Sequence, residues 1–174
     1  MAKTIELKHH IRTIPDFPKA GILFRDITTL LQNKGAFRYA VNALAGKYKG
    51  KKIDTVVAVE ARGFILGGAV AHKLGAGFVP VRKSGKLPWK KHSVSYALEY
   101  GTDTLEMHHE SIRPEDKILI VDDLLATGGT VKAVIELVKK QKGKIAGIAF
   151  LIELEDLKGR DKLKDYPVFS LIKY

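Results

Sequence analysis

Short strand-like runs alternate along this chain with longer stretches of helical periodicity, and this alternation restricts the fold more than any other feature. Residues 55–59 are rich in β-branched side chains and end at the polar segment 60–63. A helix-like stretch over 64–74 and a second short strand over 78–81 follow. Strand, helix and strand within about thirty residues are typical of a parallel βαβ unit.

The pattern returns in the second half of the chain. Residues 117–121 predict a buried strand, 126–130 a loop, and 145–152 a further strand, with 168–172 as the last. The predicted helices carry apolar side chains at helical spacing: Phe37, Val41, Leu44 and Tyr48 in one, and Val131, Val134, Ile135 and Val138 in another that ends near Gly143. We therefore expect an α/β fold with a mainly parallel twisted sheet, flanked by helices on both faces. Ligands of such sheets bind at the carboxyl ends of the strands.

The chain has the length of a single domain. Its 174 residues contain no internal repeat and no Ser/Pro-rich linker, so we treat 1–174 as one domain. No cysteine is present, which excludes disulfides, thiolate nucleophiles and zinc fingers and suits a reducing compartment. The first ten residues include Lys3, Glu6 and Lys8, and no apolar stretch approaches the roughly 18 residues of a membrane span. We expect a cytoplasmic protein with no membrane contact.

Charge favours polyanionic ligands without choosing among them. Lys and Arg exceed Asp and Glu by 30 to 19, a net charge of +11 that suits nucleic acid, an acidic membrane surface or phosphorylated small molecules, or simply a basic solvated surface. Residues 82–98 contain five Lys or Arg and no acidic residue, and Gly85 and Pro88 interrupt them. This segment predicts a basic mobile loop. Residues 94–98 and 104–107, around a turn at 100–103, predict a two-stranded excursion.

The most informative motif joins a predicted strand to a predicted helix. Asp122 and Asp123 follow the apolar run 117–121, and the Gly- and Thr-containing loop 126–130 precedes the helix. Glycines let a backbone approach a ligand closely, and the first-turn N–H groups of a helix stabilise an anion. A ribose phosphate fits this pattern, with its 5′-phosphate in the loop and its hydroxyls at the two carboxylates. The alternative is a turn in which Asp and Thr only satisfy the backbone.

These residues carry a family resemblance. Residues 120–130 (Ile-Val-Asp-Asp-Leu-Leu-Ala-Thr-Gly-Gly-Thr) resemble the phosphoribosyl diphosphate signature of the type I phosphoribosyltransferases, in the form found in the adenine phosphoribosyltransferase family. Four other segments resemble parts of that family in the same order: the base-binding hood at 15–28, the pyrophosphate loop at 60–64, the flexible catalytic loop from 82–88 through 98–101, and the carboxy-terminal segment at 151–154 and 157–160.

The resemblance implies a reaction and a distribution of roles. The family transfers the 5-phosphoribosyl group of phosphoribosyl diphosphate to adenine with Mg²⁺, giving AMP and pyrophosphate, and is typically homodimeric. Phosphoribosyl diphosphate would be bound by Arg62, Arg82, Lys83, Lys86, Asp122, Asp123, Ala126, Thr127, Gly128, Gly129 and Thr130. The displacement needs cations at the leaving diphosphate and carboxylates at the sugar, which these residue types supply. Mg²⁺ would be held mainly through substrate, with no dedicated protein ligands.

The resemblance also assigns the base and the reacting centre. Adenine would be bound by Leu23, Phe24 and Arg25 within a hood over 1–33, with Phe24 stacking and main-chain groups reading the base edge. Glu99, Tyr100 and Arg62 would be the catalytic residues, with Glu99 assisting proton movement on the purine. A flexible lid and hairpin over 82–108 would close on the site and exclude water.

Two alternatives and two local features accompany this interpretation. A regulatory nucleic-acid-binding protein on the same scaffold would use the net charge, and a 6-oxopurine transferase would keep the same phosphate loop. Gly67-Gly68 and Gly75-Ala76-Gly77 complete no dinucleotide or P-loop fingerprint, which disfavours a dehydrogenase or an NTPase. Residues 89–92 (Trp-Lys-Lys-His) are bulkier and more basic than the family usually shows, with Trp89 either exposed or a packing anchor. His108-His109 is a poor metal site, because neighbouring strand residues point to opposite faces.

Overall fold

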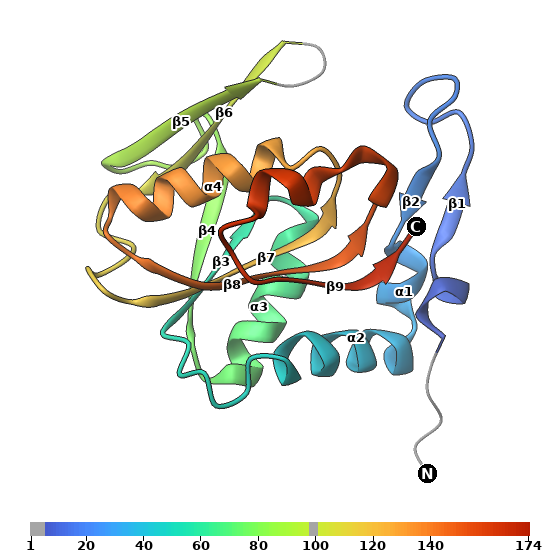
Figure 1. Cartoon of the computed structure of the whole chain (residues 1–174), viewed down its shortest axis with the longest axis horizontal. Helices are drawn as coiled ribbons and strands as arrows, with labels where there is room; N and C mark the ends of the chain where they lie inside the picture. The colour runs from blue at the N-terminus through green and yellow to red at the C-terminus, as the bar shows by residue number, and fades with distance from the viewer. Residues whose placement is uncertain (1–5, 98–100) are drawn as a thin grey trace.

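A seven-stranded sheet forms the centre of the molecule. The computed structural model describes residues 6–97 and 101–174, and within them the strand order is β5-β6-β4-β3-β7-β8-β9 (Figure 1). The strands are β3 (Thr55–Val59), β4 (Gly77–Lys83), β5 (Lys91–Ala97), β6 (Thr102–His108), β7 (Lys117–Leu125), β8 (Lys144–Glu153) and β9 (Val168–Lys173). The five neighbouring strands β4, β3, β7, β8 and β9 pair in parallel, whereas β5 and β6 are antiparallel additions at one edge. The predicted mainly parallel sheet is confirmed.

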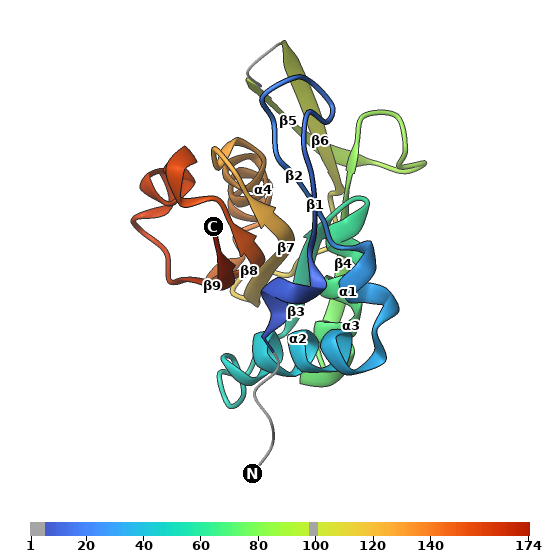
Figure 2. The same ribbon diagram turned by 90° about the vertical axis from the view of Figure 1, so that its right-hand side faces the viewer.

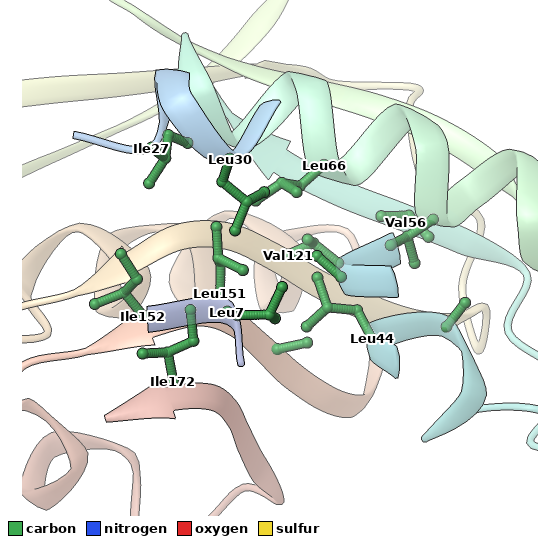
Figure 3. Close-up of a cluster of buried hydrophobic side chains, with 14 of the residues drawn as sticks. Leu7, Ile27, Leu30, Leu44, Val56, Leu66, Val121, Leu151, Ile152 and Ile172 are labelled. Atoms are coloured by element: carbon green, nitrogen blue, oxygen red, sulfur yellow. The ribbon is translucent and has the colours of Figure 1, made fainter. Parts of the chain in front are cut away.

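Helices cover both faces of this sheet, as expected. The helices α1 (Thr28–Gln32), α2 (Lys34–Gly46) and α3 (Arg62–Leu74) lie on one side, and α4 (Gly129–Lys140) lies on the other (Figure 1). Alternate residues of β7 serve the two layers: Leu119 and Val121 belong to the core beneath α2 and α3, and Ile118 and Ile120 to the core beneath α4. Figure 3 shows the first of these cores, in which side chains from η1 (Leu7–His10), helices and strands converge. Burial of such a continuous apolar face is the main stabilising contribution to a domain of this size.

The α2 helix begins and packs for identifiable reasons. Asn33 caps it, because its side-chain oxygen accepts hydrogen bonds from the backbone N–H groups of Gly35 and Ala36 at 3.0 Å. The buried stripe is centred on Ala36, Ala40 and Leu44, one position away from the predicted stripe through Phe37 and Val41, which are only half-buried. Tyr48 lies beyond the helix end, and its hydroxyl donates to the Ile148 carbonyl at 3.1 Å. Burial raises the pKa of this hydroxyl to about 12.

A small antiparallel pair forms the amino-terminal hood. Strands β1 (Arg12–Ile14) and β2 (Phe24–Asp26), which the sequence pattern did not predict, pair with each other and not with the main sheet. Asp26 fixes the base of the pair by accepting from Arg12 Nη2 at 2.6 Å and from Thr28 N at 2.9 Å. The backbone hydrogen bond from Thr28 and the Arg12 guanidinium lower the pKa of Asp26 to about 2. The hood and the β5–β6 hairpin project from the same end of the molecule (Figures 1 and 2).

Strand β7 extends four residues further than predicted. β7 continues to Leu125, because Asp122 and Leu124 still pair with Phe150 and Ile152 of β8. Asp122 and Asp123 therefore lie within the last residues of β7 and not in the loop after it.

The segment predicted as a basic loop is strand at both ends. β4 includes Arg82 and Lys83, and β5 begins at Lys91 and pairs with the whole of β6. Only the connection around Gly85, which has a φ of +82°, and Pro88 is irregular. The predicted hairpin exists, and lid closure stays a prediction.

Candidate active site

A cavity opens at the carboxyl ends of β3 and β7. It encloses about 360 Å³ and gathers residues from the sheet, the α3 and α4 amino termini and the β5–β6 hairpin. Its polar lining comprises Glu60, Arg62, Lys83, Tyr96, Asp103, Asp122, Asp123, Thr127 and Thr130. The structure therefore brings together the two carboxylates, the whole predicted phosphate loop 126–130, and two of the four predicted cations.

The two neighbouring carboxylates meet the amino terminus of α3. Arg62 Nε lies 2.8 Å from Asp123 Oδ2, and Asp123 is buried. Asp122 Oδ1 accepts the backbone N–H of Asp123 at 2.9 Å. A Cβ atom at Gly63 would lie only 2.6 Å from the same Asp122 oxygen, so α3 approaches β7 this closely because residue 63 is glycine.

Burial changes the acidity of both groups. Loss of hydration, followed by the charge of Asp123, raises the pKa of Asp122 well above its ordinary value. Loss of hydration also raises the pKa of Asp123, and the Arg62 guanidinium opposes this rise. The two adjacent carboxylates have one neighbouring cation, Arg62, which is paired with Asp123. A second hydrogen-bond donor or cation is therefore favoured at this end of β7.

The loop 126–130 ends at the start of α4, as predicted. Gly128 precedes the helix with a φ of +79°, a conformation that favours glycine. The cap residue is this glycine, which has no side chain to accept a hydrogen bond from the first helical N–H groups. An uncapped helix amino terminus that lines a cavity is a suitable phosphate site. This weakens the alternative in which Thr127 and Thr130 only satisfy the backbone.

The predicted diphosphate cations are paired with carboxylates. Glu60 Oε2 lies 3.2 Å from Arg82 Nη2 and 2.9 Å from Lys86 Nζ, and Glu60 Oε1 accepts the backbone N–H of Lys83 at 2.6 Å. Burial would raise the pKa of Glu60, but the hydrogen bonds from Lys86, Lys83 and Arg82 outweigh burial and lower the pKa. Lys83 Nζ lies 3.0 Å from Asp103 Oδ2. Arg82 and Lys86 lie outside the cavity lining and reach it through Glu60.

The hood reaches the site through one aromatic ring. The Arg62 guanidinium carbon lies 5.2 Å from the centre of the Phe24 ring, and Phe17 packs edge-on against that ring. Leu23 is 54% exposed and free to contact a ligand. The Arg25 side chain faces elsewhere, with its guanidinium 3.8 Å from the Tyr174 ring centre, which leaves only its main chain for base recognition.

Several predictions fall on the hairpin. Glu99 and Tyr100 lie outside the described residues, so their placement stays a prediction. Trp89 is 62% exposed, so it is not a packing anchor. His108 ends β6 and His109 follows in the turn. In the part of the chain that the structure describes, no three His, Asp or Glu side chains gather as a metal site.

Sequence reasoning gave no individual role to three polar residues. Glu60 and Asp103 hold the predicted cations, and buried Glu106 fixes the connection between β4 and β5 by accepting from Ser84 Oγ and Gly85 N at 3.0 Å. Of these three residues, only Glu60 lay in a segment that the sequence linked to the site, because it belongs to the segment that resembles the pyrophosphate loop. No helix within 6–97 or 101–174 has the length and apolar character to cross a membrane.

Comparison with known proteins identifies the family. The family model of the phosphoribosyl transferase domain matches residues 27–174. An adenine phosphoribosyltransferase of Brachyspira hyodysenteriae is 57% identical over 170 residues, which cover 98% of this chain and 100% of that protein. Another from Halothermothrix orenii is 57% identical over 169 residues, which cover 97% and 99%.

Solved structures agree with the fold. The crystal structure of adenine phosphoribosyltransferase from Thermoanaerobacter pseudethanolicus superposes with a TM-score of 0.94 at 51% identity, covering 97% of this chain and 98% of that one. The Saccharomyces cerevisiae enzyme, solved with adenine and an imino-altritol bisphosphate, has a TM-score of 0.90 at 42% identity, covering 95% and 96%. The resemblance that the motifs indicated is confirmed.

Proposed function

The chain belongs to the adenine phosphoribosyltransferases of the phosphoribosyl transferase family, and on this premise we propose how its residues divide the reaction. The enzyme transfers the 5-phosphoribosyl group of phosphoribosyl diphosphate to adenine and releases AMP and pyrophosphate, which is a purine salvage reaction. One observation carries the division of roles. Two carboxylates, an uncapped helix amino terminus and cationic side chains line a single cavity of about 360 Å³.

The sugar and its phosphate occupy the β7 end of the cavity in this proposal. The 5′-phosphate accepts hydrogen bonds from the loop 126–130 and the first turn of α4, where the helix dipole favours an anion. Asp122 and Asp123 accept hydrogen bonds from the ribose hydroxyls. Positive charge develops on the ribose ring as the C1–oxygen bond to the leaving group breaks, and these carboxylates stabilise that charge.

The leaving diphosphate binds among Arg62, Lys83, Arg82 and Lys86. Each of these cations already has a carboxylate partner, so the incoming diphosphate competes with Asp123, Glu60 and Asp103 for them. Arg62 is central, because it alone contacts both a sugar-binding carboxylate and the hood ring.

Magnesium fits the donor set at β7. The buried Asp123 Oδ2 atom has its Arg62 ion pair at 2.8 Å but no hydrogen bond from the described residues, and Asp122 lies beside it. Mg²⁺ prefers oxygen ligands and keeps most of its waters, so Asp122 and Asp123 would hold it through water while the substrate supplies the remaining ligands. When bound, the ion neutralises charge on the diphosphate.

Adenine binds under the hood, where Phe24 stacks on the base and main-chain groups of Leu23 and Arg25 read its edge. Phe24→Ala is expected to raise KM for adenine at least tenfold, because base–aromatic stacking is worth about 1–3 kcal/mol. KM for phosphoribosyl diphosphate should change less than threefold. Steady-state kinetics with each substrate varied would test this, and equal rises in both KM values would remove Phe24 from the adenine site.

Glu99 and Tyr100 complete the reacting centre by family resemblance, with Glu99 assisting proton movement on the purine. Glu99→Leu is expected to lower kcat more than tenfold, the usual scale for a general acid–base group, with the melting temperature unchanged. An unaltered kcat in rapid-quench and steady-state measurements would exclude Glu99 from the mechanism.

The enzyme forms a homodimer in this proposal. Ile65 of α3 and Phe78 of β4 are 45% and 38% exposed, and Phe78 meets Phe64 edge-on, which gives an apolar face suited to a second copy. Sedimentation velocity should give the mass of two chains. We place the protein in the cytoplasm, where a chain without cysteine needs no oxidising environment.

The decisive experiment measures product from phosphoribosyl diphosphate and Mg²⁺ with adenine, hypoxanthine, guanine and xanthine in parallel. AMP from adenine alone, abolished by chelation, supports the assignment of base and metal. Product from an oxopurine would overturn the hood assignment. A gel-shift assay with random duplex tests the regulatory alternative, since nucleic-acid binding would show a steep salt dependence.

A further inference from the structure

We propose that the Gly159-Arg160 turn is a positioning element for the phosphate loop 126–130, which it holds from the side opposite the substrate. The inference rests on the proposed role of that loop as the 5′-phosphate site. It concerns η3 (Gly159–Leu163), which follows η2 (Glu155–Leu157) and packs beside α4 (Figure 1). Gly159 contacts the loop without being part of the cavity lining.

Two glycines make the contact possible. A Cβ atom at Gly159 would lie 2.0 Å from the carbonyl oxygen of Ala126, and a Cβ atom at Gly128 would lie 2.7 Å from the carbonyl oxygen of Gly159. Each glycine therefore presents a Cα hydrogen to a carbonyl oxygen of the other segment, a weak but directional pair of contacts. No other residue type fits at position 159 without separating the two backbones.

The turn is held in place by an ion pair on its other side. Arg160 donates from Nε to Glu153 Oε1 at 2.8 Å and from Nη2 to Glu153 Oε2 at 2.5 Å, and Glu153 is only 4% exposed. Arg160 also donates from Nη1 to the Val168 carbonyl at 3.1 Å, which connects the turn to β9. The bidentate geometry fixes direction as well as distance. The hydrogen bond from Leu154 N to Leu125 O at 3.0 Å connects the same region to the start of the loop.

This arrangement sets which backbone groups face the phosphate. Ala126 lines the cavity, but its carbonyl oxygen lies against Gly159, which does not, so we infer that this oxygen is kept from the phosphate. A loop without this support would sample orientations in which carbonyl dipoles face the anion. The turn therefore acts on phosphate affinity through the loop and touches no substrate itself.

Gly159→Ala tests the inference, with Gly68→Ala as the matched control. Gly68 lies in α3, and a Cβ atom there would meet nothing within 4 Å. We expect Gly159→Ala to weaken binding of ribose 5-phosphate, measured by calorimetry, and to raise KM for phosphoribosyl diphosphate, each at least tenfold. KM for adenine at saturating phosphoribosyl diphosphate should change less than twofold, a split that general destabilisation would not produce. Gly68→Ala should match the parent protein in all three.

Arg160→Lys keeps the test decisive should Gly159→Ala fail to fold. Lysine retains the charge beside Glu153 but not the bidentate geometry, so we expect a threefold to tenfold loss of ribose 5-phosphate affinity in a folded protein. Unchanged ribose 5-phosphate affinity in folded Gly159→Ala, or in Arg160→Lys where Gly159→Ala does not fold, would overturn the inference. So would equal losses for phosphate and adenine.

Thr127→Ala separates this inference from the function on which it rests. Thr127 lines the cavity, so its loss should weaken ribose 5-phosphate binding whatever the turn does. If Thr127→Ala binds ribose 5-phosphate more weakly and Gly159→Ala binds it normally, the positioning role of the turn is rejected and the phosphate role of the loop is kept. A normal Thr127→Ala would reject the loop assignment and the inference together.

Discussion

Arg62→Ala is expected to lower kcat/KM for phosphoribosyl diphosphate by about 100- to 1,000-fold, the cost of removing one preorganised group that stabilises developing charge. Arg62 starts α3, lies 2.8 Å from Asp123 Oδ2 and contacts the Phe24 ring. Its loss would remove a cation from the leaving diphosphate. It would also leave the buried Asp123 carboxylate without its ion pair, so the sugar-binding pair would change its protonation as well. Initial rates with phosphoribosyl diphosphate varied at saturating adenine would measure the effect.

Arg38→Ala is the matched control, because Arg38 is an exposed α2 residue outside the cavity lining. Its kinetics should equal those of the parent protein, which excludes a general effect of lowering the net charge. A decrease of less than threefold in Arg62→Ala would show that Arg62 serves the fold and not the reaction.

Asp122→Asn is expected to stabilise the protein while lowering kcat/KM at least tenfold. The pKa of Asp122 in the folded protein lies well above its value in the unfolded chain. The folded state therefore binds the proton more tightly, and this contribution to stability is lost as the pH rises through the folded-state pKa. At neutral pH the fold must either bury the charge of Asp122 or bind a proton to neutralise it, and both cost stability, whereas asparagine carries no charge and still accepts the hydrogen bond from Asp123 N. We expect a rise in melting temperature of about 2–4 °C, which corresponds to about 1 kcal/mol in a domain of this size.

Two comparisons make this result specific. Asp156→Asn removes a carboxylate from an exposed position and should leave both the melting temperature and the rate unchanged. The melting temperature of the parent protein should rise relative to that of Asp122→Asn as the pH falls from neutral to mildly acidic, because only the parent has the Asp122 carboxyl group to protonate. A lower melting temperature for Asp122→Asn at neutral pH would contradict the assigned direction of the pKa change. An undiminished rate would remove Asp122 from the sugar site.

Local patterns in the sequence were sufficient for the frame of the fold and for part of the site. The β-branched runs at β3, β7 and β8 and the helical spacing in α3 and α4 predict a parallel sheet, because each pattern reflects what one element buries. The position of Asp122, Asp123 and the loop 126–130 follows from the same reasoning, since the carboxyl end of a parallel strand is where ligands bind. These features depend on residues that are neighbours in the chain.

Strand limits were less predictable. The polar pair Asp122 and Asp123 indicated the end of a strand, yet β7 continues to Leu125 because β8 offers backbone partners that far. The hood strands β1 and β2 were missed because each has only three residues and neither joins the main sheet. Pairing with a distant segment decided both outcomes.

Only the tertiary structure assigned the supporting residues. Glu60 holds Arg82 and Lys86 from more than twenty residues away, and Asp103 of β6 reaches Lys83 of the neighbouring strand β4. Gly159 must be glycine because of Ala126, a contact with no trace in the periodicity of either segment. The sequence by itself determined the layers of the fold and the chemistry of the motif at β7, because burial and ligand binding there act on consecutive residues. The tertiary structure decided which cations are held ready and what supports the phosphate loop, because those roles depend on distances between segments that fold together from different parts of the chain.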